Sequence, residues 1–216
     1  LGLLDELRLG RLLPDLFTYN AAISSCEKGR QWEKAVHMLQ SLRESFLRPV
    51  LMTYNAAVSA CEKCRQWESA LSLLQDLLRD RIRPSVITYN ALASACQSSG
   101  RWEHALHLLV QMLEIDALPN EITCCVVTRA CRESRQWEIG IWVLAALRSR
   151  LVQPGSIPYD ETVGACEACQ RPQPTVRLLG ELAREVGVAR ACSALSSPGA
   201  VGLRPDGRLQ DRKGCG

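Results

Sequence analysis

Residues 18–35 read TYNAAISSCEKGRQWEKA, and the chain repeats this string almost unchanged at a fixed interval. Residues 53–70 read TYNAAVSACEKCRQWESA, and residues 88–105 read TYNALASACQSSGRWEHA. The interval is thirty-five residues. Internal periods of about 20–50 residues are typical of solenoids, propellers and other arrays. The sequence therefore predicts a stack of similar units in place of a globule with one central core.

Prolines and tryptophans keep the same period over a longer stretch. The prolines are Pro14, Pro49, Pro84, Pro119 and Pro154. The tryptophans, each followed by a glutamate, are Trp32, Trp67, Trp102 and Trp137. A tryptophan at a fixed place in each unit suits a packing anchor, and a glutamate in the first turn of a helix favours the helix dipole.

Each period predicts two helices. The segment 16–28 places Tyr19, Ile23 and Cys26 at helical spacing, and we expect Gly29 to end this helix. A second apolar stripe runs from Trp32 to Phe46. Pro49 is expected to end the second helix, because proline disfavours helical geometry in the residue before it. No strand signal has comparable strength, so the predicted fold class is all-α, an α-solenoid of stacked helix-turn-helix repeats.

The expected organisation places complete repeats between two irregular ends. Residues 1–13 align with the second half of a repeat, and residues 189–216 are rich in Gly, Pro and Ser without helical periodicity, which indicates a disordered tail. The expected units are the second helix of a truncated repeat at 1–13, repeats at 14–48, 49–83, 84–118 and 119–153, a degenerate fifth repeat at 154–188, and the tail. The chain is therefore expected to be a fragment of a longer array.

Composition and charge narrow the function classes. The chain is 47% hydrophobic and 23% charged with a mean hydropathy of −0.06, and it contains no apolar run long enough to cross a membrane. Residues 190–216 hold five basic and two acidic residues; the rest of the chain holds 21 of each. The repeat region is thus neutral, and we expect no association with membranes.

Cysteine spacing argues against disulfides and metal sites. One repeat position carries a cysteine five times, at Cys26, Cys61, Cys96, Cys131 and Cys166. Cysteine is among the most buried residue types, so these five are interpreted as core residues in a reducing compartment. The C-x-x-C pairs Cys61/Cys64 and Cys166/Cys169 lie too far apart to share a zinc ion. We expect no metal and no cofactor.

The string P-x-x-x-T-Y-N-x-x-x-x-x-C, followed by a turn and W-E-x-A-L-x-L-L, resembles the pentatricopeptide repeat over about residues 1–187. The resemblance implies a right-handed solenoid that binds single-stranded RNA, with one nucleotide facing each repeat and two or three side chains reading it. It also implies a role in organellar RNA metabolism, as an adaptor in processing, stability, editing or translation. The implied location is a mitochondrion or a chloroplast.

The resemblance also implies which residues contact the RNA. The main base-reading residue follows T-Y in the first helix, and the second follows the proline that closes the repeat. An apolar residue three positions before the main reader packs against the base. The main readers are Asn20, Asn55, Asn90, Cys125 and Asp160. The second readers are Val50, Ser85, Asn120 and Gly155, paired with the first four in that order. The base-stacking residues are Phe17, Met52, Ile87, Ile122 and Ile157.

Helical geometry agrees with a reading role for the asparagines. At about 100° per residue, Asn20 falls with Phe17 and Ser24 on a stripe beside the apolar face. An asparagine amide offers both a donor and an acceptor to a base edge. The alternative is that the asparagines cap the helix or bond to its backbone, but they lie several residues inside the helix.

The pairs predict a pyrimidine-leaning readout by the family's pattern. Asn55 with Ser85 favours cytosine, Asn90 with Asn120 a pyrimidine, and Asn20 with Val50 leans the same way. Cys125 with Gly155 departs from the pattern, and Asp160 lacks an identifiable partner.

A second class of function stays open. Helical solenoids also serve as scaffolds for other proteins, and the neutral repeat region favours that alternative because phosphate neutralisation normally drives affinity for RNA. Arginines recur at or near each inter-helix turn and offer local charge: Arg30, Arg65, Arg101, Arg135 and Arg171. No catalytic constellation is visible, and the H-x-E signature of the deaminase domain found in some relatives is absent. We expect a monomer without enzymatic activity that binds single-stranded RNA, with other RNA-processing proteins as further partners.

Overall fold

The computed structural model describes residues 15–115, 117–149, 155–170 and 180. These residues form nine α-helices of 13 residues each and no strand, so the fold is an all-α helical-repeat solenoid. The helices are α2 (Leu16–Lys28), α3 (Trp32–Glu44), α4 (Leu51–Lys63), α5 (Trp67–Arg79), α6 (Val86–Ser98), α7 (Trp102–Glu114), α8 (Glu121–Glu133), α9 (Trp137–Ser149) and α10 (Ser156–Ala168). The expected truncated helix at 1–13 and the expected tail at 189–216 lie outside the described residues.

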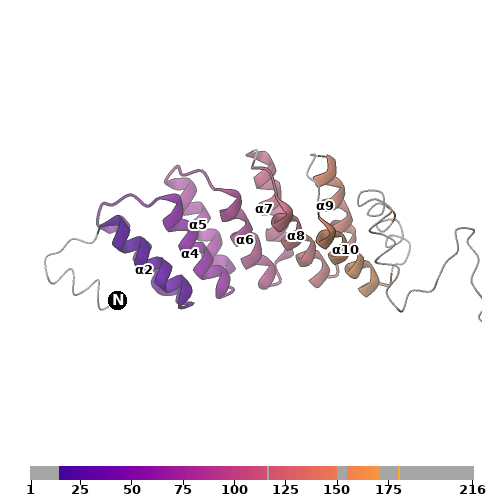
Figure 1. The fold of residues 1–216 in the computed structure, drawn as a ribbon, viewed down its shortest axis with the longest axis horizontal. Helices are drawn as coiled ribbons and strands as arrows, with labels where there is room; N and C mark the ends of the chain where they lie inside the picture. Colours follow the sequence, from indigo (N-terminus) through magenta and orange to yellow (C-terminus); the bar gives the residue numbers. More distant parts are fainter. Residues whose placement is uncertain (1–14, 116, 150–154, 171–179, 181–216) are drawn as a thin grey trace, which may run out of the picture.

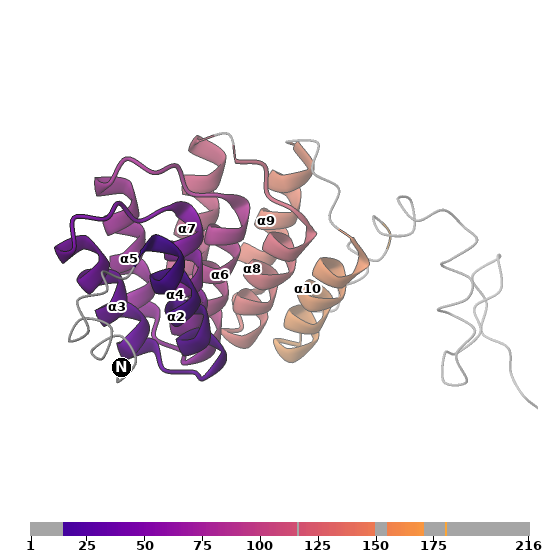
Figure 2. The same ribbon diagram turned by 60° about the vertical axis from the view of Figure 1, so that its left-hand side comes forward.

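The helices stack in chain order and form two layers (Figures 1 and 2). The first helices of the repeats, α2, α4, α6, α8 and α10, each contact the next first helix along the stack. The second helices, α3, α5, α7 and α9, pack against first helices, and within the described residues no Cα atom of one second helix lies within 8 Å of another second helix. Closer spacing in one layer curves a stack toward that layer, so the first helices form the inner side of the array.

A repeated core holds the layers together. Each described first helix with the T-Y-N motif buries its tyrosine and its periodic cysteine, as Tyr54 and Cys61 do in α4. The second helix contributes an alanine and leucines, such as Ala70 and Leu77 in α5, and all four of these side chains have 0% exposure. Full burial of a large apolar side chain contributes about 1.5–3 kcal/mol. All five periodic cysteines are buried, as the sequence predicts.

The first helix ends just before Gly29, as the sequence predicts, but the second helix ends earlier than expected. Gly29 has an ordinary φ of −80°, and the residue after it, Arg30, takes the left-handed conformation with φ 52°. The second helix ends at Glu44 instead of continuing to Phe46, which is 97% exposed and has φ 57°. In both cases the left-handed residue allows the N–H of the next residue to donate a hydrogen bond to the last turn of the helix, as Leu47 N does to Leu42 O (3.3 Å). The prolines follow these turns and do not themselves end the second helices.

Hydrogen bonds also join the inter-helix turn of one repeat to the inter-helix turn of the next. Ser99 Oγ donates to the carbonyl oxygen of Arg65 (2.9 Å), and Cys64 Sγ donates to that of Arg30 (3.2 Å). Cys169 Sγ lies 3.5 Å from the carbonyl oxygen of Arg135 and makes the same contact. The second cysteine of each C-x-x-C pair therefore links the turns of neighbouring repeats.

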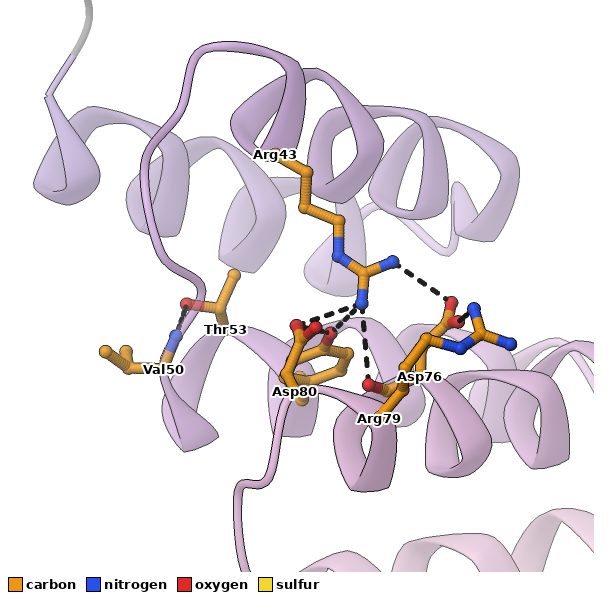
Figure 3. A network of polar contacts seen from close by, with 7 residues as sticks. Arg43, Val50, Thr53, Asp76, Arg79 and Asp80 are labelled. Atoms are coloured by element: carbon orange, nitrogen blue, oxygen red, sulfur yellow. Dashed lines mark hydrogen bonds and ion pairs between the residues drawn. The ribbon is translucent and has the colours of Figure 1, made fainter.

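One charged network ties the first two repeats together (Figure 3). The Arg43 guanidinium extends from α3 to Asp76 and Asp80 at the end of α5, with Nη1 3.4 Å from Asp76 Oδ2 and Nη2 2.9 Å from Asp80 Oδ2. Tyr54 Oη on α4 donates to Asp80 Oδ2 (2.6 Å) and accepts from Arg43 Nη2. The three helices α3, α4 and α5 are joined at this point.

Candidate functional site

A polar stripe runs along the inner face of each first helix. In α2 it consists of Asn20, Ser24 and Glu27, none of which is buried, whereas Tyr19, Ile23 and Cys26 on the core face are buried. The stripe recurs in α4 and α6, because each repeat keeps the same residue types at the same places. The predicted separation of a core face from a polar face is thus present.

Each first helix exposes one large apolar side chain beside the stripe. These are the predicted base-stacking residues, and their exposed fractions run from 79% for Phe17 to 47% for Ile157: Phe17, Met52, Ile87, Ile122 and Ile157. A single exposed apolar residue needs no explanation, but five at one repeat position form an ordered row. The row is available to contact an apolar or aromatic ligand face.

The three predicted reading asparagines are partly exposed, and each is held by the next repeat. Asn20 Oδ1 accepts a hydrogen bond from Thr53 Oγ1 (2.7 Å), Asn55 Oδ1 from Thr88 Oγ1 (2.7 Å), and Asn90 Oδ1 from Thr123 Oγ1 (2.6 Å). The threonines are buried, with at most 1% exposure. The asparagine is therefore neither a helix cap nor an unrestrained side chain: its oxygen is bound across the repeat boundary.

The second reading residues are the N-cap residues of the following first helix. Ser85 Oγ accepts from Thr88 N (3.3 Å), and Asn120 Oδ1 accepts from Thr123 N (3.0 Å). Val50 occupies the same place without a side-chain acceptor, and its N–H donates to Thr53 Oγ1 (3.3 Å). Ser85 and Asn120 thus cap a helix and also lie beside a predicted reading asparagine.

The third pair makes a direct contact. Asn90 Nδ2 donates to Asn120 Oδ1 (3.2 Å), which already accepts from the backbone of Thr123. This contact fixes the orientation of the Asn90 amide, since its oxygen faces the Thr123 hydroxyl and its nitrogen faces another oxygen. The pair Asn55 and Ser85 is connected through Thr88, which bonds to both.

The pattern lapses at the fourth repeat. Cys125 replaces the asparagine, and Pro158 stands where the other repeats have the threonine. Gly155 lies against the Glu121 carboxylate, which occupies the space that a Cβ would take. Burial raises the pKa of the Cys125 thiol, so it stays neutral at physiological pH. Asp160 is exposed.

Most charged groups near the stripe are paired across repeats. Glu27 accepts from Lys63 Nζ (2.8 Å) and from Ser59 Oγ (2.9 Å). The pKa of the Glu27 carboxyl lies below its usual value, because hydrogen bonds from Lys63 and Ser59 outweigh the opposing effect of burial. Further along, Glu161 is nearly buried between Arg129 (3.1 Å) and Arg132 (3.0 Å). The charge of the stripe is therefore largely compensated within the protein.

The turn arginines fall into two groups. Arg30, Arg65 and Arg135 are exposed and left-handed, with φ between 52° and 57°. Gly100 holds the equivalent left-handed place in the third repeat, and the Arg101 guanidinium lies over the Trp67 ring (5.1 Å to the centroid). Arg171 lies outside the described residues.

The described residues bring together no group of three or more His, Cys, Asp or Glu side chains that could hold a metal ion. His104 packs its ring on Trp67 (4.8 Å between centroids), and His107 Nε2 lies 3.2 Å from Gln111 Nε2. Within the described ranges, no helix has the length and apolar character required to cross a membrane.

Sequence reasoning missed the threonines. Thr53, Thr88 and Thr123 repeat as regularly as the asparagines, and Pro158 breaks their series in the repeat that follows the loss of asparagine at Cys125. The absence of both residues at the same junction is a signal in the sequence that the asparagine and the threonine act together. A threonine near a helix start, however, is usually assigned to capping.

Comparisons with known proteins agree with this architecture. Three family models match: the pentatricopeptide repeat domain over residues 2–63, the PPR repeat family over 49–98 and the PPR repeat over 87–116. Together they span more than half of the chain. A search of curated proteins finds no match.

Solved structures of repeat proteins have the same fold. The pentatricopeptide repeat protein PPR10 from maize is 24% identical with a TM-score of 0.68, over 95% of this chain and 32% of its own length. PPR10 in complex with an 18-nt psaJ RNA element is 21% identical with a TM-score of 0.62, over 88% of this chain and 27% of its own. The PPR domain of Arabidopsis thaliana protein-only RNase P 1, in complex with tRNA, is 14% identical with a TM-score of 0.67, over 77% of this chain and 88% of its own.

The chain thus spans about a third of the maize protein's length. The repeated T-Y-N helices, the matching family models and the shared solenoid lead to one assignment. The chain belongs to the pentatricopeptide repeat family.

Proposed function

We propose that the chain binds single-stranded RNA along its inner face, with one nucleotide at each repeat. One observation carries the proposal: each of the first three repeats presents an exposed apolar side chain next to a partly exposed asparagine amide. An apolar side chain stacks on a base without regard to sequence, and an amide distinguishes base edges. The RNA complexes of PPR10 and of the RNase P domain, which share this fold, support the proposal.

The proposed readout is pyrimidine-rich. Asn55 with Ser85 selects cytosine, Asn90 with Asn120 selects a pyrimidine, and Asn20 with Val50 leans to a pyrimidine. Phe17, Met52 and Ile87 contact the corresponding bases, and Ile122 and Ile157 extend the row. Cys125 with Gly155 and the lone Asp160 contribute little selectivity.

The proposed biological role is that of an adaptor in organellar RNA metabolism. The processing, stability, editing or translation of a transcript would then depend on where the repeats bind. The location proposed on family grounds is a mitochondrion or a chloroplast. Three partly selective positions do not define one site in a transcriptome, so target choice would rest on further repeats or on partner proteins.

Binding of the chain to short pyrimidine and purine RNAs at two salt concentrations tests the proposal. We expect tighter binding to the pyrimidine RNA, with the preference retained at the higher salt. Asn90→Thr is expected to shift the preference of its nucleotide toward adenine while leaving the others unchanged. Absence of binding, or equal binding to both RNAs that modest salt abolishes, contradicts base reading.

A scaffold for proteins is the second candidate function. The observation in its favour is that the cations near the stripe are largely neutralised by Glu27 and Glu161. Proteins normally gain affinity for single-stranded RNA from Lys and Arg side chains that are free to neutralise its phosphates. Purification of the chain with bound protein and without RNA affinity would favour this candidate.

A further inference from the structure

Three buried threonines occupy the boundary between a reading asparagine and the next repeat. We propose that Thr53, Thr88 and Thr123 are specificity-determining positioning residues, which hold the asparagine amide so that it presents N–H groups to the base. The inference rests on the proposed binding of RNA. It implies that each reading unit spans two repeats and is not contained in one.

Every one of these threonine hydroxyls has two partners in common, a backbone N–H and the asparagine Oδ1. Thr88 and Thr123 each have a third, Ser85 Oγ (3.0 Å) and Asn120 Oδ1 (3.0 Å). The backbone N–H of the N-cap residue donates to Oγ1, from Val50 (3.3 Å), Ser85 (3.1 Å) and Asn120 (3.2 Å). The hydroxyl therefore acts as an acceptor toward the backbone and has one proton to donate. The shortest contact of each hydroxyl is to the asparagine Oδ1, at 2.6–2.7 Å, and we assign the proton to this bond.

The bond removes one of the two orientations open to the amide. With Oδ1 facing the buried hydroxyl, Nδ2 is the group left for a ligand. A base must then offer an acceptor at this point, and cytosine N3 and O2 or uracil O2 and O4 do so. At the third site one Nδ2 hydrogen is already donated to Asn120, which leaves the second hydrogen for the base.

The fourth repeat supports the coupling between the two residues. Cys125 has lost the amide, and Pro158, thirty-three residues later, has lost the hydroxyl. In the three preceding repeats both groups are present and bonded. We infer that the nucleotide facing Cys125 is not selected.

The test compares Thr88→Val, Thr88→Ser and Thr18→Val in the full chain. Valine matches the shape of threonine without the hydroxyl, and serine keeps the hydroxyl. Thr18 is the matched control, because it occupies the same helix position but donates to Asp15 Oδ1 (2.6 Å) and not to a reading asparagine. Binding is measured to RNAs in which each nucleotide is varied in turn, and Asn55→Ala identifies the nucleotide facing Asn55.

Thr88→Val is expected to reduce the base preference at that nucleotide by about tenfold and to leave the neighbouring preferences unchanged. Thr88→Ser is expected to retain the preference, and Thr18→Val to change none. If Thr88→Val keeps the wild-type preference, the inference is wrong although RNA binding stands. If the wild-type chain itself shows no base preference, base reading and this inference fail together.

A second measurement does not depend on RNA. The Asn55 side-chain NH₂ resonances of the free protein are expected to lie away from the values of a solvent-exposed asparagine. In Thr88→Val they are expected to move to those values, while in Thr88→Ser they stay. Identical Asn55 side-chain resonances in the wild-type and Thr88→Val chains would overturn the inference even if every variant folds.

Discussion

Arg43 Nη2 and Asp80 Oδ2 lie 2.9 Å apart and, together with the Arg43–Asp76 ion pair, join the second helices of the first two repeats, whose backbones do not approach each other. Asp80 caps the C-terminus of α5, where a carboxylate is unfavourable because the helix dipole is negative at that end. Arg43 and the Tyr54 hydroxyl compensate that charge. In the third repeat Ile115 stands at the place of Asp80, so this network belongs to one junction.

Asp80→Asn is expected to lower the free energy of unfolding by about 1 kcal/mol at neutral pH, because Arg43 loses the nearer of its two charged partners. The pKa of the Asp80 carboxyl lies below its usual value, since hydrogen bonds from Tyr54 and Arg43 outweigh the opposing effect of burial. A lowered folded-state pKa stabilises the protein above the unfolded-state pKa of about 4, and this contribution disappears as pH falls through the folded-state value. The difference between wild type and variant should therefore shrink below about pH 4.

Denaturant unfolding of both proteins at several pH values measures this difference. Arg79→Gln is the control, because Arg79 is paired with Asp76 on the same helix but its side chain is 75% exposed. An equal loss of stability in both variants would mean that the Arg43–Asp80 contact has no special weight.

The left-handed turn in the third repeat gives a backbone prediction. Gly100→Ala should lower the free energy of unfolding by about 1 kcal/mol, because φ is 70° and an L-residue is strained there even though no atom crowds the added Cβ. Gly29→Ala, at φ −80°, should be neutral or slightly stabilising. Thermal unfolding measures both variants, and the melting temperature of Gly100→Ala should be the lower one. Similar melting temperatures would contradict a strained backbone at residue 100 in the Gly100→Ala variant.

On helix α6, different residues should determine stability and RNA binding. Leu92 on α6 is fully buried, and Leu92→Ala should lower the free energy of unfolding by about 2–5 kcal/mol. Ile87, on the same helix, is 70% exposed, and Ile87→Ala should change stability by less than about 0.5 kcal/mol. Under the proposed function Ile87→Ala nevertheless weakens RNA binding, which titration with a pyrimidine RNA measures. Unchanged affinity would remove Ile87 from the binding face.

Removing a carboxylate from the polar stripe should strengthen binding to RNA. Glu27→Gln frees Lys63 from its ion pair and reduces repulsion of phosphates. Affinity should rise several-fold at low salt, and the slope of log affinity against log salt should steepen by about 0.7 for the one additional phosphate contact. Glu68→Gln makes the same charge change in the first turn of a second helix, away from the stripe. If both variants bind equally, the effect is one of net charge and not of position.

The period of the sequence predicted most of the fold. The helix starts at Leu16 and Trp32, the core role of Tyr19 and Cys26, and the exposed position of Phe17 all follow from apolar spacing, because a stack needs the same buried face in every layer. Helix ends were less predictable. Arg30 and Phe46 adopt left-handed turns that favour glycine, and a side chain of either type gives no sign of that conformation.

The candidate site was predictable as a set of positions but not as a set of contacts. The resemblance pointed to Asn20, Asn55 and Asn90, and the structure places them on one inner face, yet their roles remain a prediction. The bond from Thr88 to Asn55 joins residues thirty-three positions apart in neighbouring repeats. Helical spacing within one repeat contains no information on such a contact.

The periodic cysteines also allow the local unfolding of individual repeats to be measured. Burial raises the pKa of the thiol to about 12 for Cys61 and to about 11 for Cys96 and Cys131. Alkylating reagents attack the thiolate, so in the closed state these thiols are nearly inert at neutral pH. Cys64 and Cys169, in the turns, are less enclosed. The rate at which each buried thiol is alkylated therefore reports how often its own layer opens, one layer at a time and without any added label.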